Sequence, residues 1–171
     1  MAKAIKVVTN KVRFSYAHVF QPQVSLEEGK APKYSVSILV SKTDKDTIER
    51  INKAVEQCKE ENKSVWGGTI PKGLKGGLRD GDEEKDDPAY AGCYFINANS
   101  TQKPGVVDAE LNPIIDANEF YSGCYGRASI SFFAYNTSGS KGVGCGLNNV
   151  QKLEDGERLG GSTTAADDFA V

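Results

Sequence analysis

The segment YGRASISFFAYN, residues 125–136, separates into two different faces when every second residue is taken. Small and apolar residues on one face alternate with three aromatic rings, an arginine and two serines on the other. A half-buried strand turns its apolar residues to the core, so Tyr125, Arg127, Phe133 and Tyr135 are predicted to face outward. Aromatic rings on a sheet stack with nucleic-acid bases, and arginine neutralises phosphates. This face therefore indicates a platform for a single strand of nucleic acid.

Two other predicted strands offer weaker candidates for the same chemistry. CYFINANS, residues 93–100, places Phe95 on one face with two asparagines, and KYSVSILV, residues 33–40, places Lys33 on one face with two serines. The predicted stacking residues are Phe95, Tyr125, Phe133 and Tyr135, and the predicted phosphate contacts are Lys33, Arg79, Lys103 and Arg127. The alternative is that the rings are covered by a helix, a long loop or a second subunit.

The pattern of elements predicts a mainly β protein. Residues 5–20 indicate one long or two short strands, and further strands follow from residues 33, 93, 125 and 142. The only strong helical periodicity covers about residues 44–62, between early and late strands. This order favours an OB-like antiparallel barrel of five strands or slightly more, with a β-sandwich as the competitor. We expect a single domain over residues 1–160 and a flexible acidic tail over residues 161–171.

The charge is unevenly distributed along the 171 residues. Residues 1–79 carry a formal charge of +7 and residues 80–171 carry −9, which together give −2. A cationic binding face with an acidic segment elsewhere is compatible with this division. No apolar run reaches the roughly 20 residues of a membrane span, and the N-terminus does not resemble a signal peptide. We therefore expect a cytoplasmic protein without membrane contact.

Catalytic and metal sites are not indicated. The four cysteines are widely separated, which favours reduced, buried thiols over zinc ligands, and His18 has no placed partner for base catalysis. GVGCGLNN lacks the features of a phosphate-binding loop and indicates a strand with close backbone approach. The acidic run DGDEEKDD, residues 80–87, leaves a metal-dependent nuclease open as a third hypothesis, but a solvated loop is favoured. We expect no cofactor.

Four stretches carry a resemblance to known proteins: KYSVSILVSKTD, LRDGDEEKDDPAYAGCYFINANS, EFYSGCYGRASISFFAYN and KGVGCGLNNVQKLEDGERLGG. Together they resemble a family of bacteriophage and prophage OB-fold single-stranded DNA-binding proteins. The resemblance implies an OB barrel, a role in phage DNA replication or recombination, no cofactor and a homodimer, with phage or host replication proteins as possible partners. It leaves binding of double-stranded DNA and the choice between DNA and RNA open. The runner-up is a protein-interaction module whose aromatic face is a subunit interface.

The tail carries Asp167, Asp168 and Phe169, which could imitate a nucleic-acid strand or recruit a partner. Many single-stranded DNA-binding proteins end in acids followed by a terminal phenylalanine, whereas Ala170 and Val171 follow here. A pocket that needs the terminal carboxylate beside the ring would not accept this end. Electrostatic competition with DNA remains as the hypothesis for this segment.

Overall fold

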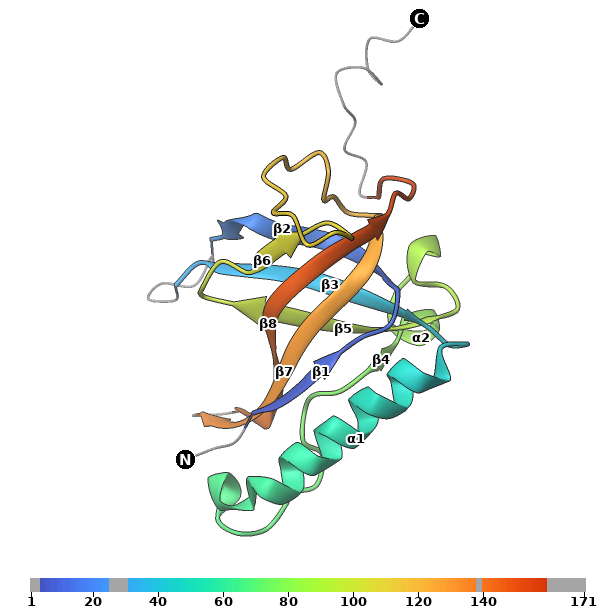
Figure 1. The fold of residues 1–171 in the computed structure, drawn as a ribbon. Coiled ribbons are helices and arrows are strands. Elements are labelled where there is room, and N and C mark those ends of the chain that lie inside the picture. The colour runs from blue at the N-terminus through green and yellow to red at the C-terminus, as the bar shows by residue number, and fades with distance from the viewer. Residues whose placement is uncertain (1–3, 25–30, 138–139, 160–171) are drawn as a thin grey trace, which may run out of the picture.

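The computed structural model describes residues 4–24, 31–137 and 140–159 (Figure 1). The strands are β1 (Ile5–Val8), β2 (Val12–Gln23), β3 (Lys33–Ser41), β4 (Arg79–Asp80), β5 (Cys93–Ser100), β6 (Gly105–Val107), β7 (Tyr125–Thr137) and β8 (Ser140–Glu154). The helices are α1 (Lys45–Glu61) and α2 (Gly81–Glu84), with 3-10 turns η1 (Lys63–Trp66) and η2 (Pro88–Tyr90). The predicted tail contacts at Asp167, Asp168 and Phe169 lie outside the described residues.

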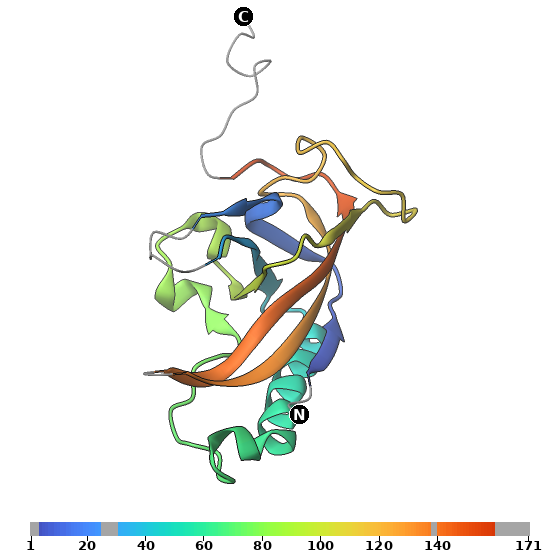
Figure 2. The ribbon, with the colours of Figure 1, turned by 90° about the vertical axis from the view of Figure 1, so that its left-hand side faces the viewer.

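Five of the strands close into a barrel, in the order β2-β3-β5-β8-β7 and back to β2. Neighbouring strands are antiparallel except at β5–β8, which meet in parallel at Asn99 and Gly146. Strands β1, β4 and β6 extend this ring at its edges. In Figures 1 and 2 the long β7–β8 hairpin bends across the barrel opposite β3 and β5. The predicted OB-like barrel is confirmed, with three short strands added to it.

Helix α1 lies between β3 and β5 in the chain and packs against β1, β7 and β8. Its boundaries agree with the predicted residues 44–62, and the carboxylate of Asp44 accepts a hydrogen bond from the Thr47 amide at the first turn. Ile51, Val55 and Cys58 are buried against the barrel, as their helical spacing predicts. None of the described helices is long and apolar enough to cross a membrane.

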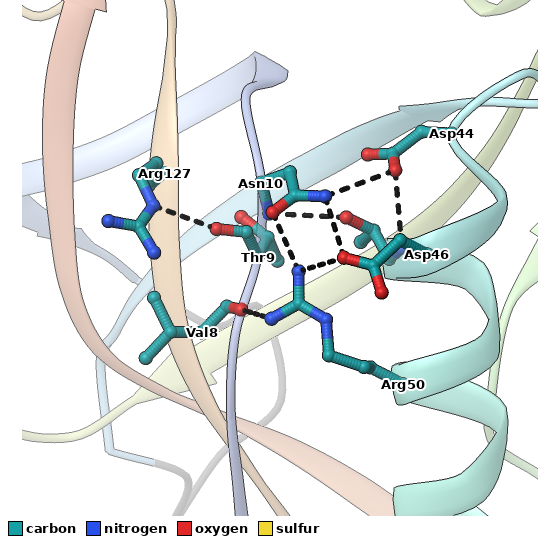
Figure 3. Close-up of polar contacts among 8 residues, drawn as sticks. Val8, Thr9, Asn10, Asp44, Asp46, Arg50 and Arg127 are labelled. Carbon is teal, nitrogen blue, oxygen red and sulfur yellow. Dashed lines mark hydrogen bonds and ion pairs between the residues drawn. The ribbon is translucent and has the colours of Figure 1, made fainter.

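The junction between β1 and β2 is tied to the start of α1 by a polar network (Figure 3). Arg50 donates to the backbone carbonyl of Val8 and, at 2.8 Å, to the side-chain oxygen of Asn10. The side-chain nitrogen Nδ2 of Asn10 donates to the carboxylates of Asp46, at 2.9 Å, and Asp44, at 3.3 Å. These contacts hold the β1–β2 junction against the first turns of α1, the helix at the lower end of the barrel in Figure 1.

The substitution Gly126→Ala tests whether β7 and β8 must approach each other closely at this position. A Cβ atom at this position would lie 1.8 Å from the carbonyl oxygen of Gln151 on the neighbouring strand. Because that atom belongs to the backbone, the strands would have to separate, and we expect Gly126→Ala to lower the free energy of unfolding by about 1–3 kcal/mol. Chemical denaturation would measure the loss.

Gly146→Ala is the matched control on the partner strand. Its added Cβ would lie 3.6 Å from the nearest atom, the Ser131 carbonyl oxygen, which is an ordinary van der Waals contact. We expect little change in stability for this variant. Equal losses for the two variants would contradict the close approach at Gly126.

Candidate nucleic-acid interface

Strand β7 has the two faces that its sequence predicts. The alternate residues that face the core are all buried: Gly126, Ala128, Ile130, Phe132 and Ala134. The opposite face is accessible, with Phe133 39% exposed, Arg127 exposed and Tyr125 and Tyr135 half-buried. The rings and the cation that prompted the prediction therefore do reach the surface.

The ring of Phe133 lies against the glycine-rich part of β8. A Cβ atom on Gly144 would be 2.4 Å from this ring, and one on Gly142 would be 2.8 Å from the hydroxyl of Tyr135. Both glycines thus make room for an aromatic side chain on the outer surface of the barrel. The predicted close backbone approach in GVGCGLNN is confirmed at Gly142, where an added Cβ would lie 2.5 Å from the Lys75 carbonyl oxygen, and Gly144 in addition makes room for the Phe133 ring.

Strand register aligns one outward residue from each of the five barrel strands. Ser131 of β7 pairs with Gly146 of β8, and Gly146 pairs with Asn99 of β5. The alignment continues from Asn99 to Ser35 of β3 and from Ser35 to His18 of β2. We call these residues the outer row: Ser131, Gly146, Asn99, Ser35 and His18. All are small or polar and at least partly accessible, so the row is a path across the strands without a bulky barrier.

At its β2 end the outer row enters an open hollow of about 330 Å³. Tyr16 lines it and is 57% exposed, together with His18, Ser35, Lys85, Tyr90 and Asn97. The β2–β3 register shifts between Ser15 and His18, and Tyr16 has a backbone φ of +48° within this bulge. Bulges re-aim side chains, and a left-handed backbone at a non-glycine residue is strained, which is typical of functional positions.

Sequence reasoning missed Tyr16 as a candidate. Regular alternation along SYAHVF gives no sign of an extra residue, and the positive φ depends on contacts from elsewhere in the chain. One such contact is the hydrogen bond from the Ala17 amide to the Ser122 hydroxyl, at 3.0 Å.

Tyr125 and Arg127 lie at the other end of β7, where it pairs with β2. The guanidinium of Arg127 donates from Nε to the Thr9 carbonyl at 3.0 Å, as Figure 3 shows. The ring of Tyr125 has Arg13 at 5.3 Å and Lys11 at 5.6 Å from its centroid. The predicted face is therefore divided into two clusters, one at Tyr125 and Arg127 and one at Phe133 and Tyr135.

The prediction of base stacking on Phe95 does not fit the structure, because this side chain is completely buried. Residues 79–92, which we call the cover segment, fold over it. Tyr90 meets the Phe95 ring edge-on at 5.2 Å between centroids, and both pack with Leu39 in a cluster separate from the barrel core. The hydroxyl of Tyr90 donates to Ser37 on β3 at 3.0 Å. For Phe95 the alternative prediction, that a long loop covers the ring, is therefore the correct one.

The three remaining predicted cations occupy different surroundings. Lys33 is exposed at the start of β3, two residues from Ser35 of the outer row. Lys103 is exposed, with its ammonium 5.9 Å from the centroid of the Phe20 ring. Arg79 belongs to the cover segment, where it bonds Glu84 at 2.9 Å and lies over the buried Phe95 ring at 4.8 Å. Arg79 is therefore engaged within the protein, whereas Lys33 is open to a phosphate.

The acidic run predicted as a solvated loop instead contains the short helix α2, Gly81–Glu84, and it is held by Lys42, which lies between β3 and α1. Lys42 donates to Asp80 at 2.8 Å and to Asp82 at 2.7 Å. These hydrogen bonds lower the pKa of both carboxyls and raise the pKa of Lys42. Because the carboxyl pKa values are lowered, the clamp contributes fully above their ordinary pKa of 3.8 and is lost as the pH falls through the lowered values.

Among the described residues, no group of three or more histidine, cysteine or acidic side chains is placed to hold a metal ion. All four cysteines are free; Cys58, Cys124 and Cys145 are buried as predicted, whereas Cys93 is only partly buried. Burial raises the pKa of the Cys145 thiol to about 12, which keeps it protonated and unreactive. The chemistry that the described surface offers is stacking, hydrogen bonding and charge neutralisation.

A family model described as "Enterobacter phage Enc34, ssDNA-binding protein" matches residues 5–171. The chain belongs to this family. Protein p50 of Acyrthosiphon pisum secondary endosymbiont phage 1 is 30% identical over 173 residues, which cover 96% of this chain and 92% of p50. The family assigned from the sequence is thereby confirmed.

Two solved structures extend the comparison to three dimensions. The single-stranded DNA-binding protein of bacteriophage Enc34, solved in complex with single-stranded DNA, superposes with a TM-score of 0.77 at 28% identity. The match covers 91% of this chain and 90% of the Enc34 chain. The bacteriophage T7 protein gp2.5 has a TM-score of 0.64 at 15% identity, over 96% of this chain and 99% of gp2.5, and supports the fold alone.

Lys42→Met tests whether the lysine clamp holds the cover segment of this Enc34-family chain. Without the ammonium, the carboxylates of Asp80 and Asp82 repel each other. Asp82 then shifts away from the backbone amide of Gly92, which donates to it at 3.0 Å in the parent protein. We expect several-fold faster hydrogen exchange across residues 80–92 at neutral pH, measured by mass spectrometry.

Lys53→Met is the control, because Lys53 pairs with Glu49 at 2.9 Å on the exposed side of α1. Its exchange pattern over residues 80–92 should match the parent protein. An unchanged pattern in Lys42→Met as well would mean that the apolar contacts of Tyr90 hold the segment without the clamp.

Proposed function

We propose that this chain binds and protects single-stranded DNA with little sequence preference during phage DNA replication or recombination, and that it acts by binding without catalysis. The observation that carries the proposal is the outer row, a continuous accessible path across all five barrel strands with aromatic side chains beside both ends. Membership of the Enc34 family and the similarity to a relative solved with single-stranded DNA support it. The groove across the second and third strands is also where OB barrels bind oligonucleotides.

Bases would stack on Phe133 and Tyr135 at the hairpin end of the row and on Tyr16 at the β2 end. Small side chains along the row leave room for a strand and provide hydroxyl and amide hydrogen bonds. Stacking is tolerant of sequence because every base has a π-face, at about 1–3 kcal/mol per base. This composition explains why we propose binding with little base readout.

Phosphates would be neutralised by the exposed cations Lys33 and Lys103, which form no ion pair with the other described residues, and by the guanidinium of Arg127, whose Nε alone is bonded to Thr9 among those residues. Arg127 and Tyr125 are separated from Phe133 by at least six residues of extended strand, or about 20 Å. A strand that contacts both clusters would therefore have to continue past the outer row along β7. Arg79 would take part only after leaving Glu84.

We further propose that the protein acts as a homodimer in the cytoplasm of the host cell, where phage DNA is copied. Phage or host replication proteins are candidate partners there. Sedimentation of the purified chain would test the dimer directly, since a monomer mass at micromolar concentration would contradict it.

The salt dependence of binding tests the phosphate contacts. Fluorescence anisotropy with labelled oligo-dT, beside a duplex of equal length, would measure affinity at several salt concentrations. Because protein cations displace condensed counterions, we expect the logarithm of the affinity to fall linearly with the logarithm of salt, by about 0.7 per phosphate contact on a single strand. An affinity that does not respond to salt would rule out this part of the proposal.

Removing the rings beside the row tests the stacking contacts. We expect Tyr16→Ala and Phe133→Ala each to weaken oligo-dT binding by roughly 1–3 kcal/mol, because each loses one base-stacking surface. Leu153→Ala is the matched control, since Leu153 is as exposed as Phe133, at 39%, but lies near the far end of β8. Equal effects of Phe133→Ala and Leu153→Ala on affinity would contradict the assignment of the row.

The exposed rings of Phe133 and Tyr16 also favour a second candidate function, a protein-interaction module in which this face is a subunit interface. In that case the same two variants would change the oligomeric mass and leave DNA affinity unaltered. Measuring mass and affinity on the same samples separates the two functions.

A further inference from the structure

A second cationic feature lies beside the hairpin end of the outer row. Residues 71–75, which follow α1 and η1, pass next to the β7–β8 hairpin, as Figures 1 and 2 both show. Between them is an open hollow of about 290 Å³, which we call the lysine hollow. Its lining residues are Pro71, Lys72, Gly73, Leu74, Lys75, Thr137, Ser140 and Lys141.

The backbone on both sides of the lysine hollow is fixed. Lys75 and Gly142 form a parallel bridge, in which the Val143 amide donates to the Lys75 carbonyl at 2.9 Å. A Cβ on Gly142 would lie 2.5 Å from that carbonyl, and one on Gly76, whose φ is +122°, would lie 2.2 Å from the Val143 carbonyl. The two segments can meet this closely only because both positions are glycine.

The charge around the hollow is unbalanced. Lys72, Lys75 and Lys141 are all exposed, and within the described part of the chain none of them forms an ion pair. No acidic residue is among the lining residues. By contrast, Lys53 and Lys59 on α1 and Lys63 just after it are paired with Glu49, Glu56 and Glu60. Three cations that converge without a counter-charge create a local positive potential that attracts an anion.

The lining also decides which kind of anion fits. It holds no aromatic ring on which a base could stack, but it offers the hydroxyl of Ser140 beside the ammonium groups, while the Thr137 hydroxyl donates to the Ser140 carbonyl at 3.3 Å. Ammonium and hydroxyl donors match the oxygens of a phosphodiester. Gly142 lies between the hollow and the stacking cluster, because a Cβ added to it would be 2.5 Å from the Lys75 carbonyl oxygen and 2.8 Å from the hydroxyl of Tyr135.

We propose that the lysine hollow is a binding site for the phosphodiester backbone of a nucleic-acid strand as it leaves the outer row past Phe133 and Tyr135. This inference rests on the proposed function, and it places Lys72, Lys75 and Lys141 on the track in addition to the cations predicted from the sequence. The site holds backbone and not bases, so it lengthens the occupied strand without adding base preference.

The test compares two triple variants in the salt titration with oligo-dT. Lys72→Gln, Lys75→Gln and Lys141→Gln together remove the ammonium groups of the hollow. Lys45→Gln, Lys53→Gln and Lys59→Gln remove the same net charge from α1 and serve as the control. If each lysine of the hollow neutralises one phosphate, the salt slope of the first variant falls by about 2, at about 0.7 per contact. The control slope should stay close to that of the parent protein.

Amine labelling of the unmodified protein gives a second measurement that does not depend on how a variant folds. Saturating oligo-dT should protect Lys72, Lys75 and Lys141 from acylation several-fold, while Lys45 and Lys53 should react at unchanged rates. If the parent protein binds DNA but the slopes of both variants agree and the three lysines stay reactive, the inference is overturned and the proposed function stands. If the parent protein does not bind DNA at all, both are overturned.

Discussion

A single bridge between Asn99 of β5 and Gly146 of β8 closes the barrel, and the candidate interface depends on it. Without this contact β5 and β8 would be the two edges of one open sheet, β5-β3-β2-β7-β8, and the outer row would be interrupted between Asn99 and Gly146. Gly146 has no side chain, so it joins the two strands without raising the outer surface beside the Phe133 ring, which would lie 3.7 Å from an added Cβ.

The outer surface is divided between binding and packing. On β7 and β8 the rings lie on glycines and stay accessible, whereas on β3 and β5 the cover segment seals Leu39 and Phe95 under Tyr90. Burial of two large apolar side chains gives a stabilising contribution that an open groove would forgo. The cover segment also brings Lys85 to the edge of the hollow beside Tyr16, so it both closes one part of the sheet and borders the open part.

Much of this could be predicted from the sequence because the signals are local. The alternation of apolar and polar residues predicts the buried and outward faces of β7, and the helical spacing of apolar residues predicts the buried side of α1. Phe95 could not be assigned, because the residues that cover it depend on a clamp between Lys42 and carboxylates about forty positions away. Tyr16 could not be found, because a bulge and a positive φ break the alternation without a glycine to mark them. The alternation predicts the outward face of Arg127 correctly, but its hydrogen bond to Thr9 depends on the β1–β2 junction, which is distant in sequence.

The central claim is that a single strand of DNA follows the outer row. Photo-crosslinking with an oligonucleotide that contains 5-iodouracil, followed by mass spectrometry of the peptides, tests it most directly. The account predicts adducts on Phe133 or Tyr135 at the hairpin end and on Tyr16 at the β2 end. Adducts confined to α1, or to the surface of the loop that carries Leu111 and Ile115, with none on these rings, would contradict it.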